Sequence, residues 1–167
     1  KIMAGVRAAA AVTLYTENKR ITSDQGEVQM TDYGISGIPV FQISRYAAKS
    51  LLQRKETMVS VDFAKDDSQE RLLKHLLLQR EKRVDYTLLM TLRGMMNKKT
   101  AAGLCAYTGM DSQTLMKKLQ EGDLKSIAGA IKDYRITLTA AADFGQSQVT
   151  AGGVLTSEIL LKTMASK

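Results

Sequence analysis

Hydrophobic and polar residues alternate in three stretches of the first third of the chain, which is the pattern of β-strands. Residues 6–16 are rich in small and β-compatible side chains, and residues 17–20 supply a polar turn. Residues 26–31 alternate strictly, and residues 57–65 return to the same period. Because short polar turns join strands that run in opposite directions, this pattern favours antiparallel pairing.

The period changes after residue 37. Apolar side chains then recur every three or four positions, which predicts an amphipathic helix over about 37–54. Ser36 has a residue type preferred at an N-cap, and the chain's one proline, Pro39, falls in the first turn, where its missing N–H costs nothing. The sequence therefore predicts a helix that starts directly after a strand.

Residues 66–134 show helical periods and contain no proline, which predicts a compact bundle of four or five short helices. Asp67 and Glu70 form a capping-box pair at the front of the first helix, whose leucines make an apolar stripe. A later helix is expected over 111–122, ended by its glycine, and Asp123 is expected to open the next one.

The last part of the chain returns to strand patterns. Residues 135–145 predict one strand, and residues 146–159 predict another with a Gly-Gly break. We therefore divide the chain into residues 1–65, the first part of a barrel with one helix, residues 66–134, an inserted helical subdomain, and residues 135–167, the return strands. The predicted fold class is α+β, a small antiparallel β-barrel carrying an α-helical subdomain.

Composition narrows the range of functions. The net charge of +7 is spread among 24 basic and 17 acidic residues, which is typical of a solvated surface rather than of a concentrated nucleic-acid-binding face. The one cysteine, Cys105, fits a buried apolar position and a reducing cytoplasm. No stretch approaches the roughly 20 apolar residues of a membrane span. One histidine and one cysteine leave no metal-ligand cluster, so no metal is expected.

The stretch Gly34-Ile-Ser36-Gly37 lies between a predicted strand and a predicted helix, where nucleophile and phosphate sites are often built. A nucleophile elbow requires Gly-x-Ser-x-Gly, but here the second glycine comes one position early. The only histidine, His75, is expected on the surface of a leucine-rich helix. A complete nucleotide-binding loop is also missing. Residues 150–154, Thr-Ala-Gly-Gly-Val, permit either a plain turn or the close approach of a ligand.

The two glycine segments together resemble a bacterial flavoprotein family, the NAD(P)/FAD-dependent oxidoreductases of the aminoacetone-oxidase-like, BaiN/YhiN-like group. The family's first segment reads approximately Gly-Glu-Leu-Leu-Phe-Thr-His-x-Gly-x-Ser-Gly-Pro, and its later segment contains Thr-x-Gly-Gly-Val and ends in Met-x-Ser-Lys. The matching positions here are Gly26, Glu27, Thr31, Gly34, Ser36, Gly37, Thr150, Gly152, Gly153, Val154, Met164, Ser166 and Lys167. Asp32 stands where many members have histidine, so no role of that histidine is carried over.

The resemblance implies that this chain is the inserted module of a longer, cytoplasmic, FAD-dependent oxidoreductase, excised from its Rossmann FAD-binding domain. The module is expected to cover the flavin and help shape the pocket of a small-molecule substrate, to have the FAD-binding domain as partner, and to be inactive and without FAD when alone. Its catalytic residues stay unknown. The candidate flavin- or substrate-proximal positions are Thr31, Tyr33, Gly34, Ser36, Gly37, Thr150, Gly152, Gly153 and Val154.

The alternative is an RNA-binding or protein-interaction module built on a barrel that resembles those of translation factors. The lysine pairs Lys98-Lys99 and Lys117-Lys118 are the candidate RNA contacts, although lysines at helix ends more commonly serve solvation. Exposed methionine and leucine side chains on the short helices would instead indicate an assembly role.

Overall fold

A computed structural model describes residues 1–143, 145 and 152–167 of the chain. Its centre is one five-stranded antiparallel sheet in the order β3-β2-β1-β4-β5. The strands are β1 (Arg7–Thr16), β2 (Lys19–Met30), β3 (Ile35–Ser36), β4 (Thr57–Asp62) and β5 (Tyr134–Thr137). The sheet is an open half-barrel, and the predicted α+β class with antiparallel strands is confirmed.

The β1–β2 hairpin confirms the predicted strand and turn. Glu17 and Asn18 both have positive φ, at 49° and 61°, as the two central residues of a type I′ turn require. The two strands pair from Arg7 opposite Gln29 to Thr16 opposite Lys19, with a register shift between Leu14 and Tyr15. β1 is consequently the central strand of the sheet, hydrogen-bonded to β2 on one side and to β4 on the other.

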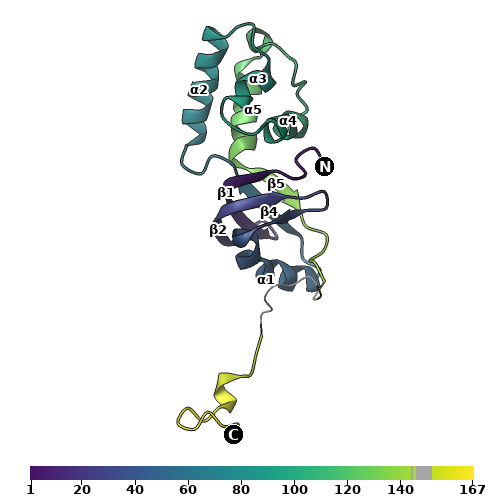
Figure 1. The fold of residues 1–167 in the computed structure, drawn as a ribbon, viewed down its shortest axis with the longest axis vertical. Coiled ribbons are helices and arrows are strands. Elements are labelled where there is room, and N and C mark those ends of the chain that lie inside the picture. The colour runs from purple at the N-terminus through teal and green to yellow at the C-terminus, as the bar shows by residue number, and fades with distance from the viewer. Residues whose placement is uncertain (144, 146–151) are drawn as a thin grey trace.

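Helix α1 (Ile38–Leu52) covers one face of the sheet (Figure 1). Alternate residues of β1 are buried, and the pairing places Val12 opposite Val61 and Leu14 opposite Val59. Ile43 is buried with them in the same core. The predicted helix over 37–54 is therefore confirmed.

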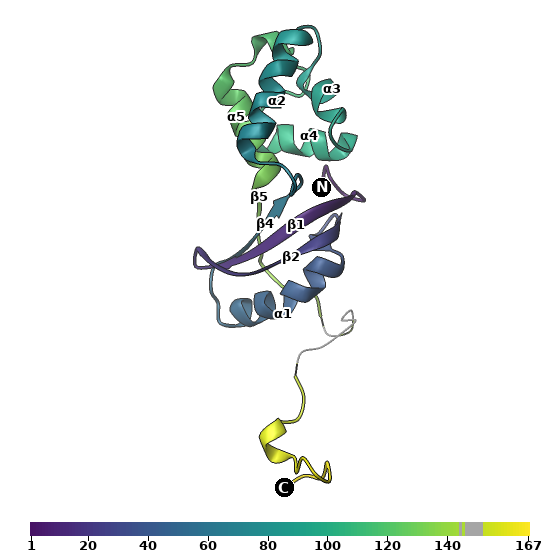
Figure 2. The same cartoon turned by 90° about the vertical axis from the view of Figure 1, so that its left-hand side faces the viewer.

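The helical subdomain lies on the other side of the sheet from α1 (Figures 1 and 2). It consists of α2 (Gln69–Lys82), α3 (Leu88–Arg93), α4 (Lys98–Tyr107), the 3-10 turn η1 (Met116–Lys118) and α5 (Glu121–Lys132). Its core is made by fully buried side chains from each of these elements, namely Leu76, Leu88, Leu92, Leu104, Met116, Leu124, Ile127 and Ile131. In the described part of the chain, no helix is long and apolar enough to cross a membrane.

Two details of the helical prediction are wrong. The N-cap of α2 is Ser68, whose Oγ accepts from the Arg71 amide at 3.2 Å, because Asp67 instead forms an ion pair with the Arg71 side chain at 3.1 Å. The helix expected over 111–122 is an irregular segment that contains only the turn η1. Its last two residues belong to α5, because a capping box between Gln120 and Asp123 starts that helix earlier than predicted.

The return strands are shorter than predicted. β5 ends at Thr137, although the Leu138 amide still donates to the Thr57 carbonyl at 2.9 Å. Residues 138–143 and 152–155 form no strand, and the 3-10 turn η3 (Thr156–Glu158) interrupts the expected extended tail. Alternation alone could not fix the strand length, since a strand also needs a neighbour to pair with. The part of the second predicted strand at 146–151 lies outside the described residues.

Candidate functional site

The first glycine segment forms a closed turn between β2 and β3. The Thr31 amide donates to the Gly34 carbonyl at 2.9 Å, and the Gly34 amide donates to Thr31 Oγ1 at 2.8 Å. These two hydrogen bonds fix the turn from both ends. Tyr33 lies at its tip with 81% of its surface exposed, and Asp32 beside it is also exposed. The turn therefore holds an aromatic side chain out from the sheet edge.

Gly37 is required by the backbone rather than by a ligand. Its φ is 113°, and a Cβ at this position would collide with the carbonyl oxygen of Glu27 in β2. Gly26 has a related role, because a Cβ there would lie 3.3 Å from Cδ of Pro39. The two glycines let the first turn of α1 cross β2 at close range.

Ser36 does not cap α1, so that prediction is wrong. It lies in β3, paired with Gln29, and the N-cap is Gly37, which makes no side-chain cap hydrogen bond. The strand pairing extends one residue further than the residue types indicate, and this moves the start of the helix. Buried Pro39 occupies the first turn, packed against Gly26, so this helix end is seated on the sheet.

The second glycine segment is described only from Gly152 onward, and Thr150 lies outside the described residues. Gly152 and Gly153 have φ values of 135° and 149°, while a Cβ on either would meet no atom within 4 Å. Val154 is 71% exposed. In Figures 1 and 2 the chain runs on from this segment away from α1 and the sheet. Among the described residues, Gly152 and Gly153 therefore show no packing against the first glycine segment.

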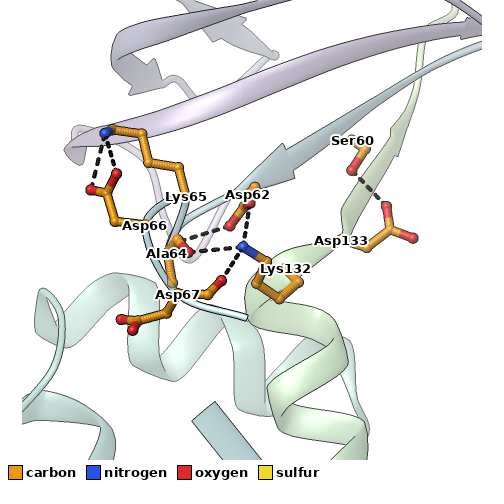
Figure 3. Close-up of polar contacts among 8 residues, drawn as sticks. All are labelled: Ser60, Asp62, Ala64, Lys65, Asp66, Asp67, Lys132 and Asp133. Atoms are coloured by element: carbon orange, nitrogen blue, oxygen red, sulfur yellow. Dashed lines mark hydrogen bonds and ion pairs between the residues drawn. The ribbon is translucent and has the colours of Figure 1, made fainter. Parts of the chain in front are cut away.

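A lysine clamp joins the sheet to the helical subdomain (Figure 3). Lys132, at the end of α5, places its Nζ 2.7 Å from Oδ2 of Asp62, at the end of β4. The same ammonium donates to the carbonyls of Ala64 at 2.9 Å and Asp67 at 2.6 Å, in the segment that leads into α2. An ammonium has three N–H donors, so this geometry engages all of them and leaves none for catalysis.

A second polar contact lies beside the clamp. Ser60 of β4 donates its hydroxyl to Oδ1 of Asp133 at 2.6 Å, and Arg135 of β5 donates Nε–H to Oδ2 at 2.8 Å (Figure 3 shows the first pair). The Phe63 amide also donates to the Ile131 carbonyl at 2.9 Å. Backbone and side-chain hydrogen bonds together fix both connections between the sheet and the helical subdomain, from β4 to α2 and from α5 to β5.

The N-terminal residues make a third junction, which sequence analysis missed. Met3 is buried against α4, where a Cβ on Gly103 would collide with its side chain. Lys99 donates its ammonium to the Ala4 carbonyl at 2.8 Å. A glycine in the middle of a helix is the signal that could have revealed this seat.

The candidate RNA contacts are divided by the structure. Lys99 is engaged by the N-terminal segment, and Lys117 pairs with Asp85 at 2.9 Å. Lys98 and Lys118 are exposed, and they lie at the start of α4 and at the end of η1. The four lysines therefore do not act as one free cationic cluster.

The described residues give little support for acid–base or nucleophilic catalysis by this chain. His75 is exposed on α2, as predicted. Cys105 is buried, also as predicted, and burial raises the pKa of its thiol above the usual range, so the thiol stays protonated at neutral pH. Burial likewise raises the pKa of Tyr134, whose ring packs against Phe63 and Tyr107. In the part of the chain that the structure describes, no three potential metal-ligating side chains lie close enough together to hold a metal ion.

A polar cleft of about 480 Å³ opens between α2, α4 and α5. Gln69, Tyr107, Thr108, Ser126 and Asp133 contribute most of its polar lining. The carboxylate of Asp133 is already bonded to Ser60 and Arg135, so the cleft offers hydroxyl and amide groups but no free charge.

Comparison with known proteins identifies the architecture. Residues 1–149 match the family described as HI0933-like protein barrel and H2TH domain. A curated relative from Clostridium scindens, named 3-dehydro-bile acid delta(4,6)-reductase, is 34% identical over 164 residues, or 98% of this chain. The chain spans 40% of that relative's length. The match confirms the resemblance found in the glycine segments: the chain belongs to the HI0933-like family of FAD-dependent flavoprotein oxidoreductases, whose barrel and H2TH domain it forms.

Proposed function

We propose that this chain is the substrate-side module of a longer FAD-dependent oxidoreductase and that it covers the reactive face of a flavin held outside the chain. The observation that carries the proposal is the closed turn at Thr31–Gly34, which presents Tyr33 from a rigid sheet edge. The turn lies in one of the two segments by which the sequence resembles this flavoprotein family.

The first turn of α1 does not fit the pyrophosphate of FAD. A dinucleotide pyrophosphate is usually bound by free amides in the first turn of a helix. In α1, that turn contains Pro39, which has no N–H and packs against Gly26 of β2. The FAD phosphates therefore belong to another part of the protein, and the flavin, when bound there, supplies the redox chemistry.

The role left to this chain is to exclude water and to orient a substrate. An exposed tyrosine combines an apolar ring with a hydroxyl that can donate or accept one hydrogen bond. Because two internal hydrogen bonds hold the turn, the backbone of Tyr33 loses little further freedom when its side chain contacts a ligand. The relative's name describes a 3-dehydro-bile acid delta(4,6)-reductase, and we extend to this chain only a small-molecule substrate.

The test is substitution of Tyr33 in the longer protein. We expect Tyr33→Ala to slow flavin reduction by substrate or nicotinamide by about tenfold, since aromatic contacts contribute about 1 kcal/mol. Tyr33→Phe separates the ring from the hydroxyl. Because Tyr33 is 81% exposed, neither change should lower the melting temperature.

The matched control is Tyr86→Ala, which removes a partly exposed tyrosine from the helical subdomain. Stopped-flow absorbance of the flavin measures the rate, and the spectrum of the same sample measures flavin content. Unchanged reduction kinetics in Tyr33→Ala, with full flavin content, would contradict the proposed position of the turn.

A further inference from the structure

Helix α1 presents a second surface that its own fold leaves uncovered. One side of the helix is buried on the sheet through Ile43 and Ala47. The opposite side carries a stripe that we name the α1 outer face, formed by Ile38, Arg45, Lys49 and Leu52. Ile38 and Leu52 are 72% and 86% exposed, so the stripe carries a large apolar side chain at each of its two ends.

The charge of this region is one-sided. Residues 33–55 contain four basic residues and no acidic residue. Among the described residues, none of the four basic side chains forms an ion pair, in contrast to those of Lys65, Arg71, Lys117 and Lys132. Arg45 is instead held over the ring of Tyr46, with its guanidinium carbon 4.6 Å from the ring centroid.

From this combination we infer that the α1 outer face docks an acidic protein surface with apolar side chains, in the part of the flavoprotein that lies outside this chain. The inference rests on the proposed function, because it takes the chain to work within a longer protein. Charge complementarity selects an acidic partner, and the exposed Ile38 and Leu52 select one that also offers apolar contacts.

The other occupants fit this face less well. A membrane-binding helix has a continuous apolar side, whereas here two basic residues separate the two apolar residues of the stripe, and the side that carries Ile43 and Ala47 is already buried on the sheet. A nucleic-acid backbone would leave Ile38 and Leu52 without a role. In a second copy of the chain, Asp66, Asp67 and Asp85 are already paired with lysine or arginine and are not available to this face.

The experiment measures the reactivity of lysines in the longer protein, purified free of nucleic acid and lipid. Sulfo-NHS acetate modifies exposed amines, and mass spectrometry follows each site. Lys49 and Lys125 are both exposed on helices of this chain. We expect acetylation of Lys49 to be about tenfold slower than that of Lys125, because the docked interface must open before the reagent can reach the Lys49 amine.

The variants test the charge. We expect Arg45→Glu to bring the rate at Lys49 close to that at Lys125. Arg83→Glu is the matched control, since Arg83 also lies over a tyrosine, 4.8 Å from the centroid of Tyr86, but in the helical subdomain. This control should leave Lys49 protected.

Several results would overturn the inference. They are equal rates at Lys49 and Lys125 in the wild type, protection that survives Arg45→Glu, protection that vanishes on dilution, or protection that appears only with added single-stranded RNA or phosphatidylserine vesicles. Flavin absorbance of the same sample separates the two proposals. A yellow protein with reactive Lys49 refutes only the docking face, whereas a colourless protein refutes the flavoprotein function.

Discussion

Gly37 is the residue of the candidate segment whose structural role is clearest. Its φ of 113° and the nearby Glu27 carbonyl exclude a side chain. We expect Gly37→Ala to lower the free energy of unfolding by about 3 kcal/mol, since backbone strain adds to a steric collision. Gly34→Ala is the control, because a Cβ at Gly34 meets no atom within 4 Å. Urea unfolding measures both, and equal losses would contradict this account.

The same pair shows what residue types can and cannot predict. Ser36 has a common N-cap side chain, and local preference alone assigns it to that position. The backbone instead places Gly37 there, because pairing of Ser36 with Gln29 and the close approach to Glu27 both depend on residues distant in sequence. The glycines of the motif could be identified from the sequence. The backbone contacts that require a glycine at position 37 could not.

At the scale of elements, the junction between α5 and β4 depends on Lys132. Its side chain is 21% exposed and that of Asp62 is 22% exposed, so removing the ammonium leaves a largely buried carboxylate without its cation. We expect Lys132→Met to lower the free energy of unfolding by about 2 kcal/mol. The control is Lys125→Met on the exposed side of the same helix. If urea unfolding shows the same loss for both, the clamp contributes nothing.

The elements themselves were predictable where their periodicity is strong. The β1–β2 hairpin, α1 and α2 follow directly from apolar spacing and turn residues. The structure of the segment 111–122 was not predictable, because its side chains pack in the subdomain although its backbone is not helical. The Leu88 amide donates to the Thr114 carbonyl and the Met116 amide to the Tyr86 carbonyl, so this segment takes its backbone partners from the start of α3 and the loop before it.

At the scale of the whole molecule, three junctions lock the helical subdomain to the sheet. They are the Lys132 clamp, the bond between Ser60 and Asp133, and the Met3 seat on Gly103. Gly103 signals a close approach at its position, but the two partners of each junction could not be read from the sequence, because they lie more than 60 positions apart. They hold the helical subdomain on the sheet that carries the Tyr33 turn and α1.

The module as a whole should therefore be a support for a flavin rather than its carrier. We expect the purified chain of 167 residues to be colourless and to leave the absorption spectrum of added FAD unchanged. The physical reason is that the first turn of α1 contains Pro39, which has no N–H and packs against Gly26. This helix start follows the glycine turn. The longer protein, purified in parallel, should be yellow. Uptake of FAD by the chain alone would show that its glycine turns bind more of the cofactor than their geometry indicates, and a colourless longer protein would refute a flavin-dependent role.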